Sequence, residues 1–247
     1  RSPMAKQLVL LAILVLSCFM PTASSAQTSA PSQTVLEQID DYVTQQFEQN
    51  QIIGGSYAIV HHGEIIAANG IGVSDEQTQA MATPETIYAT ASVSKAFTAA
   101  AILRLYEQGK IDLDAPVQRY IPWFSYQDPE RSAKVSIRHL LTHSAGVDRF
   151  AADGSIFQNE QQNRNSLENG VRALSSVALV DEPGANAAYC NTCYNVLGLL
   201  IASVSQMDYE HYLQTELFQP LQLQNTSFSS ANAASEYNWV FGQRNKS

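Results

Sequence analysis

A serine stands one helical turn before a lysine at Ser92 and Lys95, in the stretch YATASVSKAFTAAAILRLYEQGK. Residues three apart lie on the same face of an α-helix, so the two side chains would be neighbours. A serine hydroxyl is a weak nucleophile until a nearby base takes its proton, and a neutral lysine can be that base. The spacing therefore predicts a nucleophile beside its base. The ordinary alternative is a helix-capping serine and a lysine that reaches solvent.

A second candidate group is the pair Tyr189 and Asn191, two residues apart. A phenol near a lysine can relay protons, and a side-chain amide can bind a substrate carbonyl. The sequence has no G-x-S-x-G nucleophile elbow, and it leaves a Ser-His-Asp triad open without indicating one.

Two other spacings suggest metal or redox chemistry. His139 and His143 are four apart, but Leu140 replaces the glutamate of H-E-x-x-H, which favours a structural role. Cys190 and Cys193 form a C-x-x-C pair without further ligands at zinc-finger spacing. We expect no cofactor and no metal. We interpret the cysteines as small half-buried residues near a helix start, with a local disulfide as the alternative in an oxidising compartment and a redox protein as improbable.

Composition limits the class of protein. The 247 residues are 45% apolar and 15% charged, which suits one large globular domain or two interleaved ones. The net charge of −9 argues against nucleic acid, whose binding needs clustered lysine and arginine. A small molecule or a peptide is the expected partner, and the oligomeric state is left open.

The N-terminus resembles an export signal. Met4 precedes a short apolar core over Leu8–Met20, and small residues follow it. The core is too short to span a bilayer, so residues 1–26 are predicted to be a cleaved signal peptide, in which residues 1–3 precede the methionine that begins the signal. Alternatively, Cys18 could be lipidated and anchor the protein to a membrane. Either route predicts a periplasmic or secreted protein.

Before the Ser92 segment the sequence predicts a helix and two strands. TVLEQIDDYVTQQFEQN has apolar residues at helical spacing. Strands are expected over residues 56–61 and 64–69, joined by a turn at His62-Gly63. Because successive strand residues point to opposite faces, His61 and His62 are not expected to form a metal pair.

The remaining elements are mainly helical. SDEQTQAMATPETIY is predicted to be a loop, and the helix that begins near Ser92 should end at Gly109. An irregular connector covers residues 111–124. Three later helices are predicted, in VSIRHLLTHSAGV with a closing glycine turn, in NSLENGVRALSSVALV, and in YNVLGLLIASVSQ leading into MDYEHYLQTELFQPLQL.

Four blocks occur in a specific order between about Ile52 and Phe228: TPETIYATASVSKAFTAAAILRLYEQGKIDLDAPVQRYIP, IRHLLTHSAGV, EPGANAAYCNTCYNVLGLLI and YEHYLQTELFQPLQLQNTSF. With these blocks the chain resembles the serine β-lactamase and penicillin-binding hydrolase superfamily, on the side of class C β-lactamases and family VIII esterases. The resemblance implies an α/β fold of the α+β type, with an antiparallel sheet flanked by helices and a mainly helical subdomain.

The same resemblance implies an acyl-enzyme mechanism. Ser92 would be the nucleophile, Lys95 and Tyr189 would share acid and base work, and Asn191 would contact the substrate. Which of Lys95 and Tyr189 takes the first proton stays open. The implied substrates are β-lactams, D-Ala-D-Ala peptides or small esters, and the RHLLTHSAGV block favours the esterase and peptidase branch. The alternative is a non-catalytic penicillin-binding or interaction protein with the same fold.

Two features depart from the family pattern. The middle residue of Y-x-N is usually Ser or Ala, and here it is Cys190. The family also has a third motif, Lys or His, then any residue, then Gly, on a later strand that contributes to the oxyanion hole. Nothing after Tyr189 matches it, so we expect a C-terminally truncated domain that is poorly stable and weakly active or inactive.

This expected domain covers residues 27–247. Residues 27–110 would form the helix, the hairpin and the active-serine helix, and residues 111–228 the mainly helical subdomain. Residues 229–247 would begin a return segment whose strands are missing.

Overall fold

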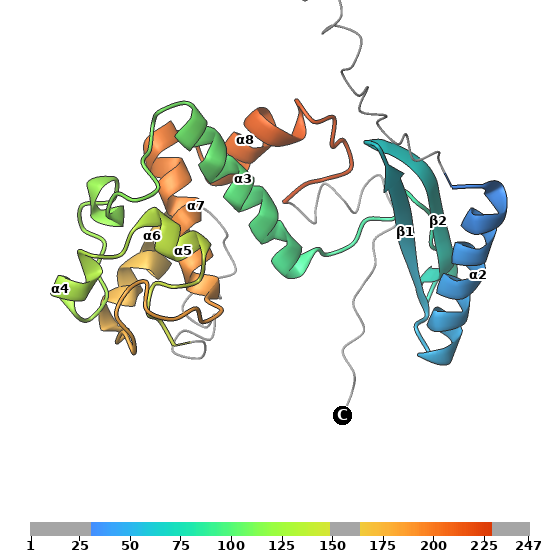
Figure 1. Ribbon diagram of the computed structural model, residues 1–247, viewed down its shortest axis with the longest axis horizontal. Coiled ribbons are helices and arrows are strands. Elements are labelled where there is room, and N and C mark those ends of the chain that lie inside the picture. The colour runs from blue at the N-terminus through green and yellow to red at the C-terminus, as the bar shows by residue number, and fades with distance from the viewer. Residues whose placement is uncertain (1–30, 149–163, 229–247) are drawn as a thin grey trace, which may run out of the picture. The chain divides into compact units, whose positions relative to one another are not determined.

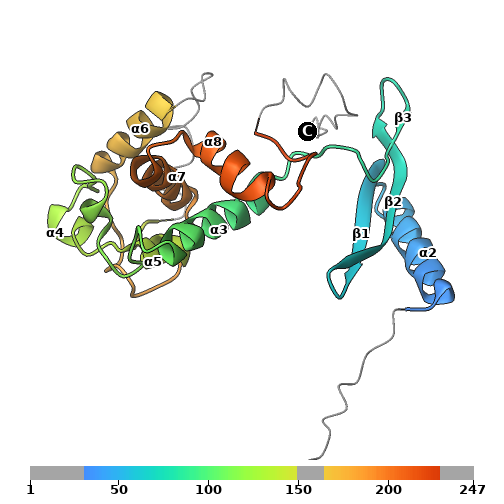
Figure 2. The ribbon, with the colours of Figure 1, turned by 90° about the horizontal axis from the view of Figure 1, so that it is seen from above.

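The computed structural model describes residues 31–148 and 164–228, and the chain divides into two compact units (Figures 1 and 2). The N-terminal unit is formed by Arg1–Ile52 and Tyr57–Asn69, and the helical unit by Ile53–Ser56 and Gly70–Ser247. The predicted signal peptide with Cys18, and the predicted return segment over 229–247, lie outside the described residues.

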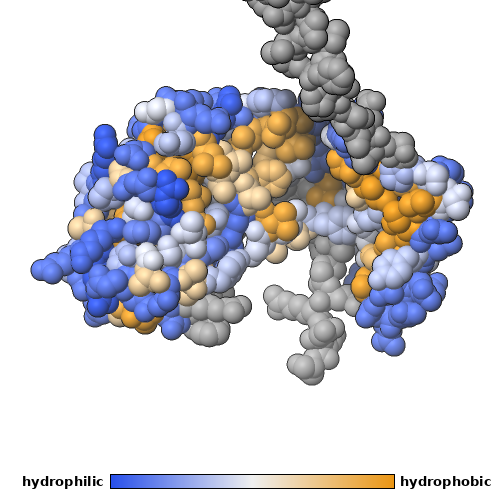
Figure 3. All heavy atoms as spheres, in the orientation of Figure 1, coloured by the Kyte–Doolittle hydropathy of each residue, from blue (hydrophilic) through white to orange (hydrophobic). Residues whose placement is uncertain are grey.

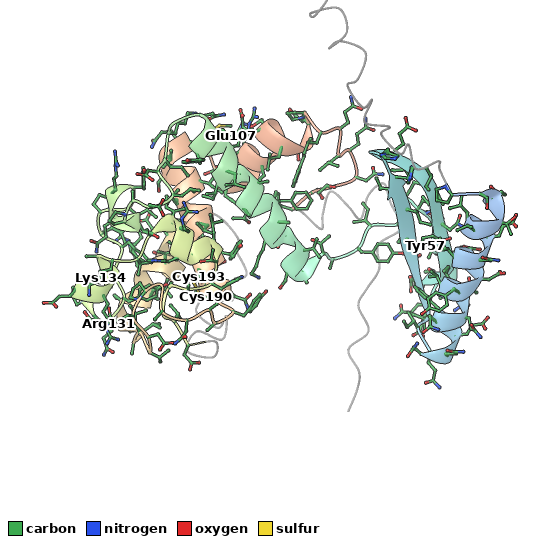
Figure 4. All side chains as sticks on the ribbon, in the orientation of Figure 1. Tyr57, Glu107, Arg131, Lys134, Cys190 and Cys193 are labelled. Atoms are coloured by element: carbon green, nitrogen blue, oxygen red, sulfur yellow. A yellow bond between two sulfur atoms is a disulfide. The ribbon has the colours of Figure 1, made fainter. Side chains whose placement is uncertain are left out.

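The N-terminal unit contains helix α2, Gln33–Gln49, as the apolar spacing predicts. A hydrogen-bond triangle joins it to the strands of this unit (Figure 4): Tyr57 OH donates to Asp40 Oδ1 at 2.7 Å, and Asn69 Nδ2 donates to the same oxygen at 2.9 Å. Burial and the neighbouring carboxylate both raise the pKa of Tyr57, so the phenol stays protonated and keeps donating.

The hairpin consists of β1, Gly54–His61, and β2, Glu64–Asp75. His62 and Gly63 form the predicted turn, with φ angles of 51° and 83°. Positive φ at both central residues is typical of the tight turns that match the twist of paired strands. The turn prediction is therefore confirmed. Hydrophobic residues are visible on this unit in Figure 3, and Val60 and Ile65 are large apolar side chains exposed there.

The sheet extends further than predicted. β2 continues to Asp75 and pairs antiparallel with β3, Ala80–Met81, inside the segment predicted to be a loop. Two glycines allow this extension: a Cβ on Gly70 would lie 2.0 Å from the Ala82 carbonyl oxygen, and one on Gly72 would lie 2.1 Å from that of Ile53. Glycine lowers the strand signal in the sequence, although here close backbone approach requires it.

In the helical unit, α7 packs against four other helices (Figures 1 and 2). The helices described in this unit are α3 (Ser94–Glu107), α4 (Pro129–Ser132), α5 (Ile137–Leu141), α6 (Arg164–Ala173), α7 (Asn191–Ser205) and α8 (Tyr209–Leu213). Short 3-10 turns cover Ala91–Val93, Val117–Arg119 and Leu174–Ser176, and a π-helical turn covers Gln214–Phe218. Helices α3, α5, α6 and α8 surround α7, whose sequence is apolar on nearly every side, as expected for a helix buried in a core.

The ends of two helices are informative. Gly109, with φ 68°, follows α3, and its amide bonds to the Tyr106 carbonyl at 2.9 Å, so the predicted glycine end is confirmed. Helix α7 begins at Asn191, earlier than predicted, because Cys190 caps it and accepts from the Cys193 amide. Within the described residues no helix is both long and apolar enough to cross a membrane.

A glycine turn follows α5 and holds a distant segment. Gly146 has φ 84°, and its carbonyl oxygen accepts the amides of Val180 at 2.8 Å and Asp181 at 3.3 Å. A Cβ at position 146 would lie 2.3 Å from the Asp181 carbonyl oxygen, whereas one at Gly109 would meet nothing within 4 Å.

Gly146→Ala is therefore expected to lower the free energy of unfolding by about 3 kcal/mol, from left-handed backbone strain plus the clash. The matched control Gly109→Ala carries only the backbone strain and should cost about 1 kcal/mol. Urea unfolding followed by circular dichroism measures both. Equal losses in the two variants would contradict the close approach at Gly146.

Candidate active site

Ser92 and Lys95 lie at the start of α3. Ser92 is exposed in the 3-10 turn that leads into the helix, and Lys95 is half-buried in its first turn. Lys95 Nζ lies 3.3 Å from Ser92 Oγ. The positive end of the helix dipole at this turn favours negative charge developing near the serine.

The backbone before Ser92 is held in an unusual conformation. Ala91 has φ 44°, a left-handed value that costs a non-glycine residue roughly 1–2 kcal/mol. Upstream, Tyr88 OH and Ser56 Oγ are 2.6 Å apart, which anchors the segment that leads to the serine. The surrounding contacts thus maintain a strained approach to Ser92.

Tyr189 and Asn191 form hydrogen bonds with Ser92 and Lys95. Tyr189 OH donates to Ser92 Oγ at 2.6 Å, and Lys95 Nζ donates to Asn191 Oδ1 at 2.8 Å. Lys95 Nζ also lies 4.8 Å from the centre of the Tyr189 ring. The structure therefore brings all four candidate residues together. Because the Asn191 oxygen accepts from Lys95, contact with a substrate carbonyl would fall to its amide nitrogen.

Hydrogen bonds to the turn after α5 hold the chain segment that contains Tyr189. The Gly184 amide donates to the Ser144 carbonyl at 2.7 Å, and the Ala188 amide donates to the His143 carbonyl at 2.8 Å. The Cys190 amide donates to the His143 side chain, at Nδ1, at 3.0 Å. The chain around Tyr189 is thus fixed to the turn after α5.

Charged residues of the α4 region contact the same segment (Figure 4). Arg131 Nε and Lys134 Nζ lie 2.9 and 3.3 Å from the Glu182 carboxylate. Arg131 Nη1 also donates to the Leu179 carbonyl at 3.1 Å. Exposed ion pairs of this kind contribute little to stability.

The two histidines at zinc-like spacing are both used as hydrogen-bond acceptors. His139 Nδ1 accepts the Ser136 amide at 3.2 Å in the capping box of α5, while His143 Nδ1 accepts the Cys190 amide. Among residues 31–148 and 164–228 there is no group of three or more His, Cys, Asp or Glu side chains that could hold a metal ion.

Cys190 and Cys193 lie at a helix start, as predicted, but they form a disulfide and are buried, so the alternative of a local disulfide is correct and the interpretation as two unlinked, half-buried residues is wrong. Both residues are buried at the start of α7 (Figure 4). Their Cα atoms are 5.4 Å apart, a distance that a disulfide can span. The first helical turn creates this proximity, and the bridge encloses Asn191.

His143 and Tyr194 complete the surroundings of the site, and sequence reasoning gave neither a place in it. Lys95 Nζ lies 5.6 Å from the Tyr194 ring centre, and Tyr194 OH donates to the Leu141 carbonyl at 3.1 Å. Burial lowers the pKa of His143, and the positive charge of Lys95 lowers it further. The imidazole of this half-buried histidine is therefore neutral at neutral pH. In the sequence, the one indication that His143 lies near the site is its position in the RHLLTHSAGV block.

A comparison with protein families identifies the family of the chain. The family model described as Beta-lactamase matches residues 39–246. The chain belongs to the beta-lactamase family. The recognised resemblance is thereby confirmed, and so is the mixed α and β fold, since solved structures with the beta-lactamase and transpeptidase-like fold superpose on it.

The chain is also similar to individual proteins of different description. Protein flp of Staphylococcus aureus (strain MW2) is 29% identical over 204 residues, covering 83% of this chain and 40% of that protein. Esterase EstB of Burkholderia gladioli is 27% identical over 220 residues, covering 85% and 55%. The octameric penicillin-binding protein homologue from Pyrococcus abyssi superposes with a TM-score of 0.72 at 27% identity, covering 84% and 47%. The chain thus spans about half the length of such relatives or less.

Proposed function

We propose that the protein is an exported serine hydrolase that forms an acyl-enzyme on Ser92. The observation that carries this proposal is the meeting of Tyr189 OH and Lys95 Nζ at a single oxygen, Ser92 Oγ, at 2.6 and 3.3 Å. A hydroxyl with two proton-transferring groups in hydrogen-bond reach has what an activated nucleophile needs. Membership of the beta-lactamase family supports the same chemistry.

In the proposed acylation step, Ser92 Oγ attacks the substrate carbonyl carbon and its proton passes to Lys95 or Tyr189. The tetrahedral intermediate collapses, the bond to the leaving group breaks, and the leaving group takes that proton. Water then attacks the acyl carbon and gives a proton to the same groups, the ester bond to Ser92 Oγ breaks, and Ser92 takes that proton back as the acid product leaves. Lys95 also holds Asn191 Oδ1 at 2.8 Å, so the amide nitrogen can face the substrate.

The proposed substrates are small esters, β-lactams or D-Ala-D-Ala peptides. The similarity to Esterase EstB and to a penicillin-binding protein homologue supports an ester or peptide-like acyl donor. The rate of deacylation separates these classes: an esterase or β-lactamase turns over, whereas a penicillin-binding protein stays acylated.

Covalent labelling of the full-length protein tests the proposal. A fluorophosphonate and a fluorescent penicillin are expected to label the wild type and not Ser92→Ala. The matched control is Ser94→Ala, which removes a hydroxyl two residues away that donates to the Ala91 carbonyl, and it should still be labelled. Labelling that survives Ser92→Ala, or a folded wild type that neither probe labels, would contradict the proposal and favour a binding protein.

A further inference from the structure

His143 contacts the chain on both sides of Tyr189. It follows α5 in a left-handed conformation, with φ 58°. Its carbonyl oxygen accepts the Ala188 amide at 2.8 Å, and its Nδ1 accepts the Cys190 amide at 3.0 Å. One residue therefore fixes the backbone immediately before and immediately after Tyr189.

The imidazole also fixes the plane of the Tyr189 ring. The two ring centres are 4.8 Å apart with an interplanar angle of 32°, and the Tyr194 ring lies 5.1 Å away at 34°. Both rings are tilted against the imidazole, at centre-to-centre distances within the range of about 4.5–7 Å over which aromatic rings attract each other. Tyr189 is itself exposed, so ring contacts with His143 help to hold its ring in the orientation in which the hydroxyl meets Ser92.

We propose that His143 is a positioning residue that keeps the Tyr189 hydroxyl within hydrogen-bond reach of Ser92. This inference rests on the proposed function, since it assigns His143 to the acylation step. His143 acts through Tyr189: the imidazole holds the Cys190 backbone and the Tyr189 ring, and the phenol then meets Ser92 Oγ at 2.6 Å. A displacement of about 1 Å in such a group can cost about a hundredfold in rate.

The hydrogen bond from the Cys190 amide to His143 requires a neutral imidazole, because Nδ1 can accept it only without its own proton. Within residues 31–148 and 164–228, the titratable groups that face the ring are Lys95 from α3, Tyr194 from α7 and Tyr189. Burial and the charge of Lys95 place the pKa of His143 below its ordinary value, so the contact is kept at neutral pH and lost as the pH falls through that lowered pKa. The acylation rate should therefore fall as the pH drops below the pKa of His143.

Two variants separate the acceptor from the backbone conformation. Asparagine and glycine both tolerate a left-handed φ, but only asparagine offers an oxygen near the position of Nδ1. His143→Gly is expected to lower the acylation rate at saturating fluorophosphonate by about a hundredfold with little change in probe affinity. His143→Asn should recover about tenfold of that loss, and its acid-side fall in rate should move to lower pH.

The control is His139→Ala, which removes a histidine acceptor of the capping box in α5. It should lower the melting temperature but leave acylation within about twofold. Hydrogen exchange of the Cys190 amide gives a readout independent of activity, with protection expected in the order wild type, His143→Asn, His143→Gly.

Two results would overturn this inference alone: acylation of a folded His143→Gly at the wild-type rate, or His143→Asn no faster than His143→Gly. A folded wild type that is not acylated would overturn the proposed function and this inference with it. The two failures are therefore distinguishable.

Discussion

Lys95→Met is expected to slow acylation of Ser92 by about 10⁴-fold, at the upper end of what one acid–base group contributes. Lys95 Nζ lies 3.3 Å from Ser92 Oγ and 2.8 Å from Asn191 Oδ1, so one substitution removes a proton-transfer partner and releases the amide that would face the substrate. Methionine keeps the length and flexibility of the side chain without the nitrogen. Single-turnover release of p-nitrophenol from p-nitrophenyl acetate measures the rate.

Two further variants sharpen this result. Lys110→Met removes an exposed lysine beyond the end of α3 and should leave the rate unchanged. Lys95→Arg keeps a positive charge but cannot take a proton from serine. If Lys95 is the base, Lys95→Arg should be nearly as slow as Lys95→Met. A rate close to wild type in Lys95→Arg would contradict that role and leave Tyr189 as the first proton acceptor.

Tyr189→Phe is expected to lower the acylation rate by about 10²- to 10³-fold. The change removes only the hydroxyl that lies 2.6 Å from Ser92 Oγ, while the ring can keep its contacts with His143 and Lys95. Stopped-flow measurement of acylation and of deacylation gives the two effects separately. Tyr106→Phe, which removes the hydroxyl of an exposed tyrosine on α3, is the control. A Tyr189→Phe protein within threefold of wild type in both steps would exclude the phenol from proton transfer.

Local features of the fold could be predicted from the sequence because neighbouring residues determine them. The turn at His62-Gly63, the glycine end of α3 at Gly109, and the apolar character of α7 each depend on a few adjacent residues. The proximity of Ser92 and Lys95 belongs to the same class, since three residues of helix suffice to bring the side chains together.

Contacts between distant segments could not be predicted in this way. The bond from Tyr189 to Ser92 joins residues 97 positions apart, and only the family resemblance suggested that they meet. The role of His143 depends on a turn that places its ring against the Tyr189 segment, which no local pattern indicates.

At some positions the residue type alone predicts the wrong backbone structure, because contacts with distant residues determine it. Gly70 and Gly72 resemble strand-breaking residues, yet each lets another backbone approach β2 closely. Ala91 adopts a left-handed φ that its residue type does not favour, and surrounding contacts maintain it next to the candidate nucleophile.

The central claim is that Ser92 carries the acyl group, and mass spectrometry of acid-quenched protein tests it most directly. The full-length protein is mixed with p-nitrophenyl acetate, quenched during the burst, digested and fragmented. We predict an acetyl group on Ser92 that is absent from Ser92→Ala and unchanged in Ser94→Ala. Ester hydrolysis at the wild-type rate in Ser92→Ala, or an acetyl group on another residue that turns over at the catalytic rate, would contradict the account.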